Sequence, residues 1–114
     1  ADAARYGRRP DLARRALSAT RTRFSGSLHA RDAAFFLGGL AESEADAASA
    51  VDWYGVYLRE SQDGAYASQA LGRRMILLQR MGNEAAAQQA ASEYARRFGG
   101  EAYGPAAQKL LHVP

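Results

Sequence analysis

The feature that most constrains this chain is a set of residue types that recurs with a step of 37 positions. A fixed period between about 20 and 50 residues is the sequence signature of stacked structural repeats, in which each unit packs against its neighbours. The sequence therefore predicts a repeat protein. The recurring sets are His29, Tyr66 and Tyr103; Ala33, Ala70 and Ala107; Ala13, Ala50 and Ala87; and Thr20, Tyr57 and Tyr94.

The units of this repeat are predicted to be helical. Apolar residues such as Ala13, Leu17 and Phe24 recur at a spacing that places them on one face of a helix. Alternating runs of β-branched residues, which indicate strands, are absent. We expect an all-α fold with the tail of a helix over residues 1–7 and further helices over residues 10–24, 28–43, 47–60, 65–81, 84–98 and 101–112.

Short polar segments supply the chemistry that ends one helix and begins the next. Ser25–Ser27 is expected to end one helix and to cap the following one. Gly82 can adopt the left-handed backbone that closes a helix, and Asn83 can then cap its successor. Asp46 is expected to cap the helix over residues 47–60.

The helix over residues 28–43 is expected to pack through an apolar stripe that includes Phe36 and Leu37, which leaves Phe35 outside the core. Gly38 and Gly39 interrupt this helix, at about 1 kcal/mol each relative to alanine. We interpret the glycines as a place where the partner helix approaches closely.

These residues resemble the tetratricopeptide repeat family. Leu37 and Gly38, followed by Ala50 and Tyr54, match its pattern of paired antiparallel helices in which the second helix carries a small residue and, four positions later, an aromatic one. The resemblance implies a short right-handed α-solenoid of about 2.5–3 stacked helix pairs, with units slightly longer than the usual 34 residues of that family.

The next unit departs from the family pattern at two positions. Leu71, Gly82 and Ala87 are in place. Arg74, however, stands where an apolar residue is expected, and Ala91 stands where an aromatic residue is expected.

The longer units also resemble those of bacterial envelope proteins, namely the Tol–Pal-associated periplasmic repeat proteins and the outer-membrane assembly lipoproteins. The segments Phe24–Ala30, Ala33–Gly38 and Phe98–Gly104 carry this likeness, although the proline usual in that turn is absent. The resemblance implies a bacterial protein that is periplasmic or associated with the envelope. Without the resemblance, we would place the chain in the cytoplasm.

The 114 residues are expected to form one domain. The domain is predicted to divide into a partial first repeat (1–27), a second repeat (28–64), a third repeat (65–100) and a C-terminal capping helix (101–114). Because the chain starts at Ala1 and not at a methionine, we expect it to be a piece of a longer protein. No apolar run approaches the roughly 20 residues that a membrane span needs.

The charges of the chain form three blocks. Residues 1–31 carry a net charge of +6, residues 32–63 carry −6 and residues 64–114 carry +3. This layout suits electrostatic contact between successive repeats or head-to-tail association of copies. A solvated surface with chance blocks of one sign is the alternative.

The sequence proposes no reaction. It contains no cysteine, and its two histidines, His29 and His112, lie far apart without carboxylates at ligand spacing. His29 stands where the other copies have tyrosine, which indicates a packing role. Turn solvation and capping explain Glu42, Glu44 and Asp46. We therefore expect a protein that is not an enzyme and that has no catalytic residue, metal or cofactor.

The first helices of stacked pairs line a concave face, and we predict that this face binds a peptide or a segment of a partner protein. Phe35 and Ile76 would supply apolar anchors, while Arg73 or Arg80 would select charge. The predicted groove residues are Asp32, Phe35, Gly39, Glu42, Gln69, Gly72, Arg73, Ile76, Arg80 and Lys109.

Two other roles stay open. The first is a structural or oligomerising module, because the partial first repeat leaves Leu12, Leu17 and Phe24 without a covering helix. The second, less favoured, is nucleic-acid binding through the arginine-rich N-terminal part. Against it, aromatic residues that could stack on bases, such as Trp53 and Tyr54, fall in the acidic middle block.

Overall fold

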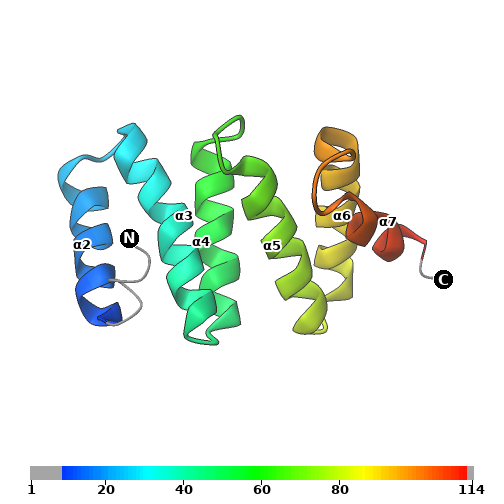
Figure 1. The fold of residues 1–114 in the computed structure, drawn as a ribbon, viewed down its shortest axis with the longest axis horizontal. Helices are drawn as coiled ribbons and strands as arrows, with labels where there is room; N and C mark the ends of the chain where they lie inside the picture. Colours follow the sequence, from blue (N-terminus) through cyan, green and yellow to red (C-terminus); the bar gives the residue numbers. More distant parts are fainter. Residues whose placement is uncertain (1–8, 113–114) are drawn as a thin grey trace.

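A computed structural model describes residues 9–112 of the chain. This part contains six α-helices and no strand (Figure 1), which confirms the predicted all-α fold. The predicted helix tail over residues 1–7 lies outside the described residues. The helices are α2 (Pro10–Arg23), α3 (Leu28–Ser43), α4 (Ala47–Glu60), α5 (Ala67–Arg80), α6 (Glu84–Phe98) and α7 (Gly104–Leu111).

The helices stand side by side in the order of the chain. Each packs mainly against the helix before it and the helix after it. Figure 1 shows the row with α2 at one end and α7 at the other, in a body of 44 × 26 × 24 Å. Most of the packing therefore joins segments that are neighbours in the sequence.

The step of 37 residues appears in the helix boundaries. Helices α2, α4 and α6 begin at Pro10, Ala47 and Glu84, and helices α5 and α7 begin at Ala67 and Gly104. Each interval equals the 37 residues on which the sequence prediction rests. Residues 37 positions apart can therefore be compared as equivalent positions.

The turn between α3 and α4 recurs between α5 and α6. The side chain of Asp46 accepts a hydrogen bond from the backbone N–H of Ser49 at 3.2 Å, and Asn83 accepts one from Ala86 at 3.4 Å. Each side chain caps the helix that follows, as predicted. Gly82, just before the second cap, has a φ of 80°, which is the predicted left-handed stop.

A buried tyrosine fixes the junction between α4 and α5 and the junction between α6 and α7. The hydroxyl of Tyr57 accepts a hydrogen bond from the backbone N–H of Tyr66 at 3.0 Å, and Tyr94 accepts the equivalent bond from Tyr103 at 3.0 Å. The residues around these N–H groups form turns, so α5 and α7 begin later than the predicted positions 65 and 101.

The two helix pairs α3–α4 and α5–α6 fill their cores in opposite ways. In the first pair Gly38 lies against a ring, and a Cβ at Gly38 would be 2.6 Å from Tyr54 Cε1. The equivalent residues of the second pair are Met75 and Ala91, and both are fully buried. The large side chain thus comes from the second helix of one pair and from the first helix of the other, which keeps both interiors filled.

Alanine substitutions at Gly38 and Gly39 should have opposite effects on the free energy of unfolding. Gly38→Ala forces a methyl group into the ring of Tyr54, and such overpacking destabilises by about 1–3 kcal/mol. Gly39 is exposed and would meet only the Tyr54 hydroxyl, at 3.9 Å, so Gly39→Ala should stabilise the helix by about 0.5–1 kcal/mol. Urea unfolding followed by circular dichroism measures both. Equal destabilisation would contradict the close approach at Gly38.

Candidate functional site

The ten predicted groove residues lie on three helices, and the structure brings part of the set together. Within residues 9–112 no hydrogen bond or ion pair joins the α7 residue, Lys109, to the other nine. The α3 residues are Asp32, Phe35, Gly39 and Glu42, and the α5 residues are Gln69, Gly72, Arg73, Ile76 and Arg80.

An ion pair joins α3 to α5 on this surface. Glu42 pairs with the guanidinium of Arg73, and its Oε1 accepts a hydrogen bond of 3.2 Å from Arg73 Nε. The hydroxyl of Tyr54 on α4 donates to the same oxygen at 2.8 Å. Charge-assisted bonds of this kind are among the stronger ones in proteins. Because Arg73 is paired with Glu42 within the chain, Arg80 is the residue that would select the charge of a partner.

The exposed aromatic residue on α3 is Phe36, and the prediction of Phe35 as an exposed anchor is wrong. Phe35 is only 8 % exposed and stacks on Tyr66, with ring centroids 4.5 Å apart. Phe36, expected in the core, is 43 % exposed, and its ring centroid lies 5.4 Å from that of Tyr66 in a T-shaped arrangement. Neighbouring positions on a helix point about 100° apart, and the ring of Tyr66 covers the first of them.

Gly72 is also removed from the predicted surface, because it is buried against the ring of Tyr103. Most of the other predicted residues keep access to solvent as exposed or half-buried side chains. We call the resulting surface the α3–α5 face, and it consists of Asp32, Phe36, Gly39, Gln69, Ile76 and Arg80 around the pair of Glu42 and Arg73.

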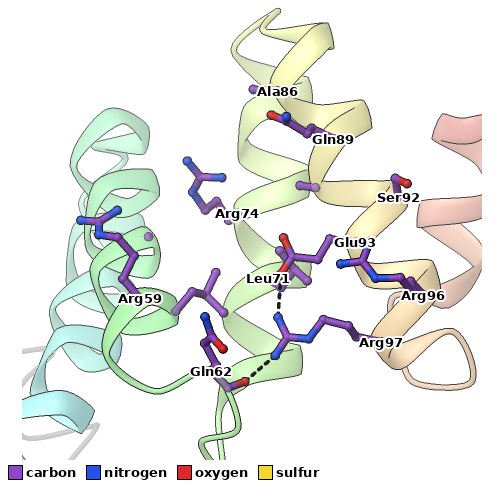
Figure 2. Close-up of a pocket in the computed structure, with 13 residues that line it drawn as sticks. Arg59, Gln62, Leu71, Arg74, Ala86, Gln89, Ser92, Glu93, Arg96 and Arg97 are labelled. Carbon is purple, nitrogen blue, oxygen red and sulfur yellow. Dashed lines mark hydrogen bonds and ion pairs between the residues drawn. The ribbon is translucent and has the colours of Figure 1, made fainter.

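A second surface is hollowed where α4 and α6 flank α5, and sequence reasoning missed it. Arginines from three helices line this groove of about 520 Å³, namely Arg59 from α4, Arg74 from α5 and Arg97 from α6 (Figure 2). We call it the arginine groove. It is lined by Gly55, Leu58, Arg59, Gln62, Leu71, Arg74, Ala86, Gln89, Ala90, Ser92, Glu93, Arg96 and Arg97.

In the described part of the chain, one of the four arginines in this groove is paired with a carboxylate. Arg97 donates to Glu93 at 2.6 Å and also to the carbonyl oxygen of Gln62. Arg74 Nε donates to the backbone carbonyl of Val51 at 3.3 Å, which leaves its charge unbalanced. Over residues 9–112 the remaining two, Arg59 and Arg96, are exposed and have no carboxylate partner. The sequence held one signal of this groove, the arginine at position 74 where the repeat expects an apolar residue.

His29 does not take the packing role that was predicted for it, since it is exposed. At the positions equivalent to His29, the backbone N–H groups of Tyr66 and Tyr103 donate to the hydroxyls of Tyr57 and Tyr94. Thr20 stands in place of these hydroxyl-bearing tyrosines at the first junction. The hydroxyl of Thr20 donates to the carbonyl of Ala16 at 3.0 Å, inside its own helix. The first junction therefore lacks the hydrogen bond between a backbone N–H and a tyrosine hydroxyl that the later junctions have.

Residues 9–112 hold no group of three histidine, aspartate or glutamate side chains that could bind a metal ion. In the same range no helix is long and apolar enough to cross a bilayer.

Fold and surfaces together define an all-α protein in which α2, α4 and α6, and likewise α5 and α7, begin 37 residues apart. Comparison of the chain with protein-family models, with curated proteins and with solved structures finds no match. The resemblance to tetratricopeptide repeats and to envelope proteins therefore stays a prediction that rests on the residues of this chain.

Stability should fall at alkaline pH, because burial raises the pKa of Tyr54 from 10.0 to about 12. The folded chain keeps this phenol protonated, while the unfolded chain releases the proton near pH 10. The free energy of unfolding should therefore keep its full value below about pH 10 and fall by about 2–3 kcal/mol between pH 10 and pH 12. Burial raises the pKa of Tyr57 and Tyr94 as well. Urea unfolding at several alkaline pH values should show a smaller decline for Tyr54→Phe, and an unchanged decline would contradict the assignment.

Proposed function

We propose that this chain is a short tetratricopeptide-like solenoid that acts as a non-catalytic protein-interaction module. Three observations support the repeat: the 37-residue step between the starts of α2, α4 and α6, the equivalent caps at Asp46 and Asn83, and the equivalent bonds of Tyr57 and Tyr94. In such arrays the first helices of successive pairs line the concave binding face. The α3–α5 face is the corresponding surface of this chain.

The observation that carries the binding proposal is an exposed aromatic ring near the start of α5 and an exposed cation at its end. Phe36 packs against Tyr66, the N-cap residue of α5, with much of its ring accessible, and Arg80 is exposed as the last residue of α5. Binding energy concentrates at a few large side chains that a partner can cover completely. A peptide segment that places an apolar side chain on Phe36 and a carboxylate near Arg80 gains from both contacts.

The ion pair of Glu42 and Arg73 gives this face a fixed geometry. It joins α3 to α5 directly, and the hydroxyl of Tyr54 holds its carboxylate from the helix between them. A surface whose elements are already held in position loses less entropy when a partner binds. We assign the pair a positioning role within the face.

The cellular setting is proposed from the resemblance alone. Similarity to periplasmic and outer-membrane assembly repeat proteins favours a module within a larger bacterial protein that is associated with the envelope or with regulation. In that setting the α3–α5 face would dock a segment of a neighbouring envelope protein. A cytoplasmic location is the alternative.

A second candidate function is oligomerisation through the α2 end of the array. Apolar side chains are exposed there, including Leu12, Phe24 at 56 % and Leu28 at 60 %. Light scattering at about 0.05 and 0.5 M salt separates the cases, because screening weakens ionic contacts and spares apolar ones. A dimer at both salt concentrations would favour this function over peptide docking.

Nucleic-acid binding through the arginine-rich N-terminal part remains the less favoured alternative. Arg14 pairs with Glu44, and Arg21 pairs with Glu60. These guanidinium groups are therefore used within the chain. Arg5 and Arg8, which belong to the same arginine-rich part, lie outside the described residues.

Arg80→Glu should weaken the binding of peptides selected on the purified chain from a displayed random library. The expected rise in Kd is about tenfold, because a charge-assisted contact becomes a repulsive one. Arg15→Glu is the matched control, since Arg15 is exposed on α2 and its replacement changes the net charge equally. Fluorescence polarisation measures both affinities.

A second selection uses the chain with the α3–α5 face altered at Phe36→Ala, and enrichment of the same peptides would count against this face. Nuclear magnetic resonance gives an independent readout, because a docked peptide should shift backbone amide signals of α3 and α5. Shifts confined to other helices would reject the assignment.

A further inference from the structure

The space between α4 and α6 can be compared with the space between α2 and α4, because the two spaces lie at equivalent positions of the repeat. In the first space the guanidinium carbon of Arg21 lies 5.5 Å from the centroid of the Trp53 ring. Arg21 also forms hydrogen bonds of 3.0 and 2.9 Å to the two carboxylate oxygens of Glu60. This space is occupied by the indole and its charges are paired, with a smaller hollow of about 330 Å³ beside the pair.

The equivalent residues between α4 and α6 leave the space open and make it cationic. Ala90 stands at the position of Trp53, and Arg97 stands at the position of Glu60. A methyl group in place of an indole leaves the hollow of about 520 Å³. A guanidinium replaces the carboxylate, so the cationic groove is a departure from the repeat and not a consequence of it.

The floor of the arginine groove departs from the repeat as well. Arg74 occupies the position equivalent to Leu37, which is buried. A Cβ at Gly55 would lie 3.4 Å from Arg74 Nε and 3.5 Å from Arg59 Nη1, so both guanidinium groups sit beside the same backbone position. Two like charges held this close repel each other, and an anion placed between them is attracted to both.

We propose that the arginine groove is a second binding site, separate from the α3–α5 face, and that it takes an acidic peptide segment. Carboxylates of the segment pair with the guanidinium groups of Arg59, Arg74 and Arg96, whose planar donors suit paired hydrogen bonds to carboxylate oxygens. An aliphatic side chain of the segment covers the apolar floor at Leu58 and Leu71.

The lining favours a peptide over a nucleic acid. None of its residues is aromatic, so the groove offers no platform on which bases could stack. Gln62 and Gln89 supply side-chain amides, which both donate and accept hydrogen bonds and so match a peptide backbone. The apolar floor suits an aliphatic side chain better than a sugar–phosphate backbone.

The test compares two probes that carry the same net charge. One is a short fluorescein-labelled peptide in which acidic pairs flank single leucines, and the other is a labelled oligothymidylate. Each is titrated with the purified chain at low and at moderate salt, and binding is followed by fluorescence polarisation. The peptide should bind more tightly than the oligothymidylate, and its affinity should fall as salt screens the ion pairs.

Two sets of variants locate the site. Arg59→Glu combined with Arg96→Glu should raise the Kd of the peptide by at least about tenfold, the effect of losing charge-assisted bonds. The matched control combines Arg15→Glu with Arg23→Glu, two exposed residues of α2, and makes the same change in net charge. The control should leave the Kd within about twofold, since distant exposed charges are screened.

Ala90→Trp tests the shape of the groove without altering its charge. It restores the indole that the equivalent position of α4 carries, and it should reduce peptide binding while the helical circular dichroism spectrum is retained. If this variant fails to fold, the double arginine variant decides alone, because Arg59 and Arg96 are exposed and unpaired within residues 9–112.

Four results would overturn the proposal. They are no binding of the peptide to the unaltered chain, equal losses in the groove and α2 variants, tighter binding of the oligothymidylate, and a loss that only Arg80→Glu produces. The last result would assign the acidic peptide to the α3–α5 face, which supports the proposed function and rejects the arginine groove. A result that rejects peptide binding at the arginine groove does not by itself reject the proposed function of the α3–α5 face.

Discussion

The array depends on one interaction, the hydrogen bond from a backbone N–H to a buried tyrosine hydroxyl at each later junction. Buried hydroxyl groups need a partner, and Tyr57 and Tyr94 each find one in the residue nine positions further on. The bond fixes where the next helix begins and how it docks. At the first junction Thr20 is too short to act in this way, and Arg21 holds α2 to α4 through Glu60 instead.

Because the turns and junctions set the backbone, the side chains between them are free to differ from unit to unit. Gly38 lies against a ring from α4, while the equivalent Met75 supplies the large group itself. The same freedom reaches the outer surfaces, where an indole fills one space and Ala90 leaves the next one open. A regular backbone thus carries two irregular faces, and the faces are where recognition can be specific.

Local chemistry made the elements predictable, and long-range contact made the sites hard to predict. Asp46 and Asn83 act within one turn of chain, so caps and helix bounds followed from sequence. Whether Phe35 or Phe36 is exposed depends on Tyr66, which arrives from the next unit, and a stripe at helical spacing does not resolve neighbouring positions. The arginine groove required three helices to be placed in space.

The charge blocks explain why the cationic groove lies at the C-terminal side. Three ion pairs join the acidic block, residues 32–63, to the basic blocks on either side. These pairs use Glu42, Glu44 and Glu60, and Asp46 is used as a cap. Few carboxylates of that block remain for the arginines of α5 and α6. An acidic partner would supply the carboxylates that this groove lacks, so charge balance favours such a partner.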